Sequence, residues 1–150
     1  MPKDIKWHFI GQLQTNKAKA VASVENLHLV ESVDRQKLAV ALNTAAEKLS
    51  KEIKILVQVN PANEVTKGGV SGIEDLLELV EFIVNNCKHL EFNGLMVIGR
   101  PHELEDMHLL IKYKEAVLEK YPQFNQLNPF ELSMGMSADY QEAVKIYLFV

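Results

Sequence analysis

The sequence predicts an α/β fold with a parallel sheet, because short apolar runs alternate with longer amphipathic stretches along its 150 residues. The apolar runs are rich in β-branched and aromatic residues and end in Gly, Asn, Asp or Ser, which is typical of strands. The run at 53–60, IKILVQVN, is almost continuously hydrophobic, as expected of a strand that helices cover on both faces. The stretches between the runs change to a helical period.

Five strands and five helices are expected in alternation. The predicted strands are 5–11, 27–33, 53–60, 92–99 and 130–134. The predicted helices are 16–23, 34–49, 73–84, 104–121 and a last one that begins at 137 and reaches at least 144. Asp34 is expected to cap the second helix, and Ser71 with Glu74 three residues later predicts a capping box at the third.

The spacing of the strands favours part of a barrel. Successive predicted strands begin about 31 residues apart on average, the spacing of an eight-unit barrel of roughly 250 residues. A doubly wound sheet fits the same alternation. Because five units do not close a barrel, we expect a partial TIM (β/α)8 barrel, as a single domain over residues 1–150.

Composition indicates a soluble chain in a reducing compartment. Apolar residues make up 47% and charged residues 24%, and the net charge of −4 gives no global signature for nucleic acid or an anionic membrane. The apolar stretches are far shorter than the roughly 18 residues of a membrane helix. The single cysteine, Cys87, excludes an internal disulfide, so a cytoplasmic location is expected. The sequence shows no zinc-ligand pattern and no Ser/His/Asp or Cys/His arrangement for nucleophilic catalysis.

The strand-to-helix junctions are where a parallel α/β fold places its ligands. At the last junction, Gly135 precedes Ser137 and a predicted helix, so free N–H groups there can bind a phosphate. The alternative is that Ser137 only caps its helix. His8 lies inside a strand, where a histidine is more often a satisfied core residue than a catalyst. Methionines such as Met96 and Met136 are likewise more often core residues than ligand contacts.

Residues 7–17, WHFIGQLQTNK, resemble the WHFIG-x-LQ-x-NK signature of the pyridoxal phosphate homeostasis proteins. Further matching segments follow in the family's order: ESVD at 31–34, VQVN at 57–60, GLM at 94–96 and LSMGMS at 132–137. The resemblance covers about residues 5–144. It implies a modified TIM barrel that holds pyridoxal 5′-phosphate at the carboxyl ends of its strands. The implied role is buffering and delivery of this cofactor in the cytoplasm, without established turnover, and a mitochondrial location stays open for a longer form.

The resemblance also implies which residues contact the cofactor. His8 and Met96 would lie beneath or beside its ring, while Ser133, Ser137 and the Met136 backbone would form half of a phosphate cradle. Active-face loops would carry the remaining candidates, which are Asn16, Lys17 and Lys67.

Aligned to the family, the chain supplies its third to seventh strands. The resemblance therefore implies that the Schiff-base lysine of the first strand and the pyridine-facing arginine of the eighth have no counterpart here. Neither Lys17 nor Lys67 occupies the lysine position. We accordingly expect weak, non-covalent binding of pyridoxal phosphate at best.

Two other readings stay open. One is a racemase-like enzyme, which is disfavoured because such enzymes need the Schiff-base lysine and a second acid/base group from another domain. The other is a non-catalytic interaction fragment. Five strands of a barrel leave two open sheet edges, so self-association through those edges is expected.

Overall fold

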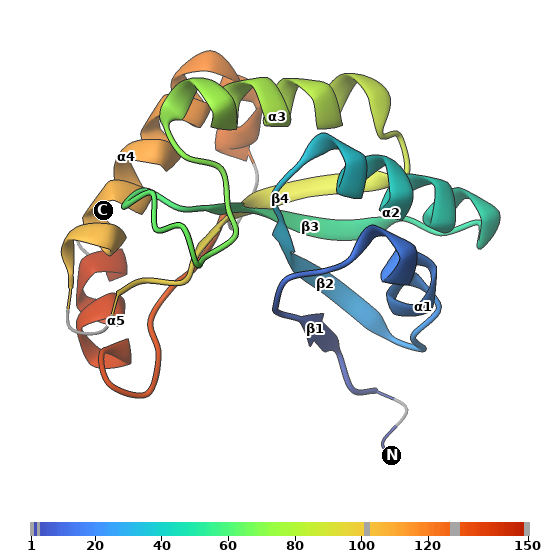
Figure 1. Ribbon diagram of the computed structural model, residues 1–150, viewed down its shortest axis with the longest axis horizontal. Helices are drawn as coiled ribbons and strands as arrows, with labels where there is room; N and C mark the ends of the chain where they lie inside the picture. The colour runs from blue at the N-terminus through green and yellow to red at the C-terminus, as the bar shows by residue number, and fades with distance from the viewer. Residues whose placement is uncertain (1, 3, 101–102, 127–129, 149–150) are drawn as a thin grey trace.

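The computed structural model describes residue 2 and residues 4–100, 103–126 and 130–148. It contains a five-stranded parallel sheet in which each strand pairs with its neighbours in chain order. The strands are β1 (Trp7–Phe9), β2 (Leu27–Val33), β3 (Ile53–Val59), β4 (Leu90–Val97) and β5 (Glu131–Ser133). The predicted α/β class and the parallel sheet are therefore confirmed (Figure 1).

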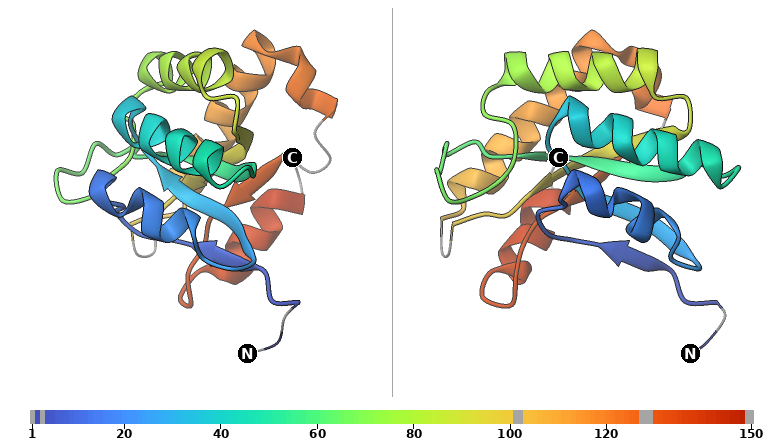
Figure 2. Two further views of the ribbon diagram at one scale, coloured as in Figure 1. Left: turned by 90° about the vertical axis from the view of Figure 1, so that its right-hand side faces the viewer. Right: turned by 45° about the vertical axis from the view of Figure 1, so that its right-hand side comes forward.

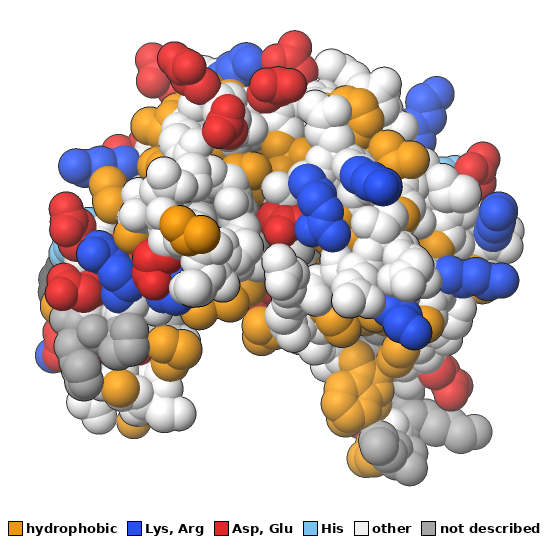
Figure 3. Space-filling model, in the orientation of Figure 1, with side chains coloured by type: hydrophobic (Ala, Val, Ile, Leu, Met, Phe, Trp, Pro, Cys, Tyr) orange, Lys and Arg blue, Asp and Glu red, His pale blue; other side chains and the backbone are white. Residues whose placement is uncertain are grey.

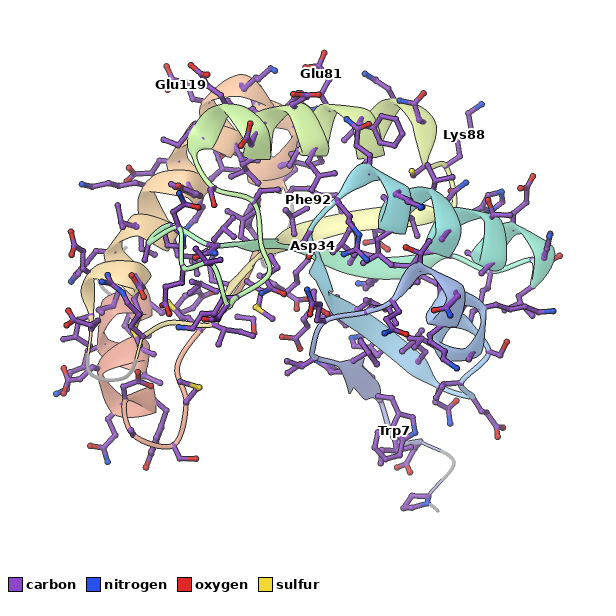
Figure 4. The ribbon with its side chains drawn as sticks, viewed as in Figure 1. Trp7, Asp34, Glu81, Lys88, Phe92 and Glu119 are labelled. Carbon is purple, nitrogen blue, oxygen red and sulfur yellow. The ribbon has the colours of Figure 1, made fainter. Side chains whose placement is uncertain are left out.

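The helices lie mainly on one side of the sheet, which is its convex, outer face (Figures 1 and 2). The elements between the strands are η1 (Thr15–Lys17), α1 (Ala18–Ala22), α2 (Gln36–Lys48), α3 (Ile73–Asn86), α4 (Glu105–Lys120) and η2 (Pro122–Gln126), and α5 (Tyr140–Leu148) follows β5. The main hydrophobic core fills the space between this helical layer and the sheet, as Phe92 illustrates (Figure 4). The inner face carries a small second cluster of Leu29, Leu56 and Met96.

A single hydrogen bond shows how strongly the sheet curls. The hydroxyl of Ser133 on β5 donates to Oε2 of Glu31 on β2 at 2.5 Å. In a flat sheet these strands would be three spacings apart, about 14 Å, which one glutamate and one serine side chain do not bridge. The inner faces of β2 and β5 therefore face each other, and the sheet forms a curled half-barrel. This confirms the predicted partial TIM barrel.

Gly94 permits the close pairing of β4 with β5. Its φ of +150° is rare for residues with a side chain, and a Cβ atom added there would lie 1.9 Å from the carbonyl oxygen of Glu131. Any side chain at this position would push β5 away from β4. The pairing of β5, the last strand of the half-barrel, therefore depends on a glycine at position 94.

Both predicted helix caps are wrong. Arg35, not Asp34, is the residue before α2, and the Asp34 carboxylate instead accepts a hydrogen bond from Arg35. At α3 the preceding residue is Gly72, while the Ser71 hydroxyl donates to Asn63 Oδ1 at 3.1 Å. In both places, the polar side chain that the sequence assigns to a helix end bonds to a loop or a neighbouring residue instead.

Several predicted boundaries also shift. β1 is three residues long rather than seven, because as an edge strand it pairs only with β2. The last helix begins at Tyr140 and not at Ser137, since residues 136–139 form a turn before it. Within the described residues, no helix is long and apolar enough to cross a bilayer.

Candidate functional site

A cavity of about 500 Å³ lies on the inner face of the half-barrel, between the strands and α5. We call it the inner-face cavity. Figure 3 shows the molecule hollowed between α5 and the N-terminal segment. Thirteen described residues line it: His8, Leu29, Glu31, Leu56, Glu131, Leu132, Ser133, Met134, Tyr140, Ala143, Val144, Tyr147 and Leu148.

Glu31 connects β1 and β5, the two edge strands of the half-barrel, at one wall of this cavity. Its Oε1 lies 2.7 Å from Nδ1 of His8 on β1, and its Oε2 accepts the 2.5 Å hydrogen bond from Ser133 on β5. Glu31 is only 4% exposed, whereas the His8 side chain is 42% exposed. Because a carboxylate only accepts hydrogen bonds, this contact assigns the ring hydrogen of a neutral His8 to Nδ1. Nε2 of His8 is then an acceptor.

A second carboxylate, Glu131, lies on the same wall. Its Oε1 accepts a hydrogen bond from the side-chain amide of Asn93, which is buried on β4. Neither lysine nor arginine is present among the thirteen lining residues. The polar wall is therefore acidic and rich in acceptors.

The opposite wall is apolar and comes from α5. Tyr140, Val144, Tyr147 and Leu148 recur at helical spacing, so they form one stripe on this helix. All four line the cavity and yet remain exposed, Leu148 by as much as 73%. The cavity thus has a polar strand wall facing an incompletely buried helical one.

The turn between β5 and α5, residues 134–139, is held by Asp139. Its Oδ1 accepts a hydrogen bond from the backbone N–H of Met136 at 2.6 Å, and Asp139 is buried. Gly135 has φ of +88°, and a Cβ there would lie 2.8 Å from the Cβ of Ala143. The glycine therefore allows α5 to fold back closely against this turn.

The loops after β3 and β4 are joined by Lys67. Its ammonium donates to Glu64 Oε1 at 2.8 Å and to the carbonyl oxygen of Gly99 at 3.0 Å. Asn60 organises the first of these loops, since its amide donates to the carbonyl oxygens of Glu64 and Lys67 and accepts from the Glu64 N–H. Lys67 consequently links these two loops and does not line the inner-face cavity.

Asp106 fixes the beginning of α4 to the loop after β4. Its carboxylate accepts the backbone N–H of Arg100 at 2.7 Å and the guanidinium at 2.8 Å. Burial raises the pKa of Asp106, but the hydrogen bonds and charge of Arg100 outweigh burial and leave the pKa below its ordinary value. This pair is structural and lies outside the cavity lining.

The sequence profile described as the alanine racemase N-terminal domain matches residues 6–149. The chain belongs to this family. Among its curated relatives, the pyridoxal phosphate homeostasis protein of Schizosaccharomyces pombe is 40% identical over 152 residues, which are 97% of this chain and 61% of the relative. The human protein of the same name is 38% identical over 95% of this chain and 54% of its own length. The chain thus spans between half and two thirds of the length of these two relatives.

Solved structures agree with this family assignment. PipY of Synechococcus elongatus PCC7942, solved with PLP bound, has a TM-score of 0.74 and 32% identity, covering 95% of this chain and 65% of PipY. Alanine racemase of Clostridium difficile 630 has a TM-score of 0.60 at 14% identity, covering 92% of this chain and 35% of its own, which is a likeness of fold alone. The predicted resemblance to pyridoxal phosphate homeostasis proteins is confirmed.

This member of the alanine racemase N-terminal domain family brings only some predicted site residues together. His8 and Ser133 line the cavity, and Met96 packs beside it against Leu29 and Leu56. Met136 and Ser137 lie exposed in the turn before α5, and Ser137 does not cap that helix. Asn16 and Lys17 are exposed at η1 and do not line the cavity.

Sequence reasoning missed the two cavity carboxylates, Glu31 and Glu131. A signal was present at Glu31, because a charged residue within the apolar run LHLVESV requires a partner if the strand is buried. Its partners lie 23 and 102 residues away, however, so only the fold reveals them. In the described part of the chain no cluster of three or more acidic, His or Cys residues suited to a metal ion is found.

Proposed function

We propose that this chain forms a pyridoxal phosphate-binding part of a homeostasis protein, which holds and delivers the cofactor without turning over a substrate. The observation that carries the proposal is the inner-face cavity, with its polar strand wall and apolar helical wall, in a chain 40% identical to a protein named for this role. The PLP reported with PipY supports the choice of ligand. A cytoplasmic location belongs to the same proposal.

The cavity residues fit the ring of the cofactor. A volume of about 500 Å³ is within the usual range for small-molecule sites, which are mostly apolar with a few convergent polar groups. Leu29 and Leu56 would contact one face of a pyridine ring, with Met96 packed behind them, and the stripe on α5 would contact the other. His8 and Ser133 would orient its polar substituents.

The phosphate would bind at the β5–α5 turn. Its N–H groups and the exposed Ser137 hydroxyl are suited to an anion. The Met136 N–H donates to Asp139 in this structure. A phosphate that used this N–H would therefore compete with the Asp139 carboxylate.

When bound, pyridoxal phosphate supplies an electrophilic aldehyde. Because no lysine lines the cavity among its described residues, this chain's own groups would bind and orient the cofactor without a covalent bond. Racemase-like turnover is not part of the proposal, because no described cavity residue supplies the lysine that such chemistry needs.

Calorimetric titration with pyridoxal phosphate tests this function, combined with borohydride reduction and intact-mass measurement of the complex. We expect saturable binding and no stoichiometric adduct on a single lysine. The absence of any saturable binding would refute the function, and one stoichiometric reduced lysine would refute the non-covalent mode.

The phosphate position has its own test in Ser137→Ala. We expect this change to weaken binding of pyridoxal phosphate by about 1–2 kcal/mol, the value of one charge-assisted hydrogen bond, and to leave unphosphorylated pyridoxal unaffected. Ser23→Ala, which removes another exposed hydroxyl, is the matched control. An equal loss for both ligands would exclude a phosphate contact at Ser137.

A further inference from the structure

We propose that the inner-face cavity selects a ligand with a protonated primary amine, so that it prefers the aminomethyl form of the pyridine ligand to the aldehyde and alcohol forms. This inference rests on the proposed function and names the ligand class of that same cavity. It follows from the hydrogen-bonding capacity and the charge of the lining residues.

The contact of His8 with Glu31 determines which ring nitrogen can accept a hydrogen bond from a ligand. Nδ1 of His8 contacts the Glu31 carboxylate at 2.7 Å, which places the hydrogen of the neutral ring on Nδ1. The other ring nitrogen, Nε2, has no hydrogen-bond partner among the described residues. The His8 side chain lines the cavity. His8 therefore offers a ligand an acceptor. The Ser133 hydroxyl, a potential donor, already donates to Glu31.

Glu131 has acceptor capacity that its hydrogen bond with Asn93 leaves unused. Its Oε1 accepts a hydrogen bond from the Asn93 side-chain amide, and its Oε2 has no hydrogen-bond partner among the described residues. A carboxylate has about four acceptor sites, so Glu131 retains most of its capacity, and each oxygen of Glu31 can accept once more. The strand wall thus offers acceptors at three side chains, His8, Glu31 and Glu131.

The charge of the lining residues also favours a cationic ligand. The cavity is lined by two carboxylates and by no described lysine or arginine. Glu131, which is half-buried, takes part in no ion pair within the described residues, and an ammonium group would supply both the opposite charge and three donors. An aldehyde oxygen is itself an acceptor and would face acceptors across the cavity. The hydroxyl of an alcohol has one donor and no charge.

The apolar stripe on α5 explains why a ring should carry the amine. Val144 and Tyr147 line the wall opposite the carboxylates and are 53% and 42% exposed. A flat apolar ring would cover this stripe while its substituent reaches the strand wall. The cavity is therefore suited to a small aromatic ring with a cationic substituent.

Calorimetric titrations at low ionic strength with the 5′-phosphates of pyridoxamine, pyridoxine and pyridoxal test the proposal. Pyridoxamine and pyridoxine phosphates differ only in an aminomethyl in place of a hydroxymethyl group. We expect the amine to bind at least about fivefold more tightly than the alcohol, the effect of one charge-assisted hydrogen bond. The aldehyde should bind no more tightly than the alcohol.

Glu131→Gln tests the cause of the preference, since glutamine keeps the side-chain length and an oxygen for Asn93 but loses the charge. We expect it to abolish the advantage of the amine, so that the ratio of the amine and alcohol affinities falls to about one. Glu119→Gln is the control, because Glu119 is exposed on α4, on the outer side of the molecule (Figure 4), and should change neither.

The outcomes separate this inference from the proposed function. Equal binding of all three compounds, or equal weakening of amine and alcohol by Glu131→Gln, would overturn the amine preference while leaving cofactor binding intact. Binding of none of the three would refute the proposed function, and the amine preference with it.

Discussion

At the scale of single residues, Glu31 determines the geometry of the inner face, because its carboxylate on β2 contacts both His8 on β1 and Ser133 on β5. Glu31→Gln removes the charge and replaces one of the two accepting oxygens with an NH2 donor, so the donor that faced that oxygen, on His8 or Ser133, loses its acceptor. We expect the free energy of unfolding to fall by about 1–3 kcal/mol, the cost of an unsatisfied buried group, in urea denaturation. Unchanged stability, equal to that of the exposed control Glu119→Gln, would mean that the contacts of Glu31 with His8 and Ser133 do not hold the half-barrel together.

The lowered pKa of Asp106 makes the free energy of unfolding depend on pH. Its folded pKa lies below its ordinary value, so its ionised form stabilises the fold above the unfolded pKa of about 3.9, and this contribution is lost as pH falls through the folded pKa. We expect Asp106→Asn to reduce the free energy of unfolding by about 2 kcal/mol at pH 7. The difference from the unmodified chain should shrink as the pH is lowered from 5 towards 3. A difference that is independent of pH would contradict the role of the carboxylate.

Individual residues show where sequence reasoning succeeds and where it fails. His8 and Ser133 could be assigned to the site because they fall in motifs that resemble a family signature. Glu31 and Glu131 could not, since their roles depend on strands that meet only when the sheet curls. Asp34 and Ser71 have the residue types of helix caps, yet nearby groups compete for their side chains.

At the scale of elements, the pairing of β4 with β5 depends on Gly94. Gly94→Ala places a Cβ 1.9 Å from the Glu131 carbonyl oxygen, so we expect β5 to separate from β4. Hydrogen exchange should then become faster at β5. Gly11→Ala is the matched control, because Gly11 also has a positive φ but has no atom within 4 Å of an added Cβ. If both variants show the same exchange, backbone strain and not the β4–β5 contact explains the effect.

The elements themselves were largely predictable. The alternation of apolar runs and amphipathic stretches indicates all five strands and the helices between them, because burial on both faces of a parallel sheet leaves a clear sequence pattern. The lengths of the edge strands were not predictable. β1 is cut to three residues because pairing, and not side-chain pattern, defines where an edge strand ends.

At the scale of the whole molecule, β1 and β5 are the two edges of the described sheet. Each presents unpaired backbone groups, and the apolar stripe of α5 is exposed nearby. We therefore expect the isolated chain to self-associate, with a sedimentation coefficient that rises with concentration. A dilute, monomeric chain with a sharp cooperative thermal transition would show that the edges are protected in solution.

The central claim is that the inner face of the half-barrel binds the cofactor without a covalent bond. An NMR titration of isotope-labelled chain with pyridoxal phosphate tests it most directly, because it locates the ligand. We predict saturable shifts for the His8 ring and for the backbone of Ser133 and residues 136–139, with resonances of the outer helix α3 unchanged. Shifts confined to surface lysines, or none at the inner face, would contradict the account.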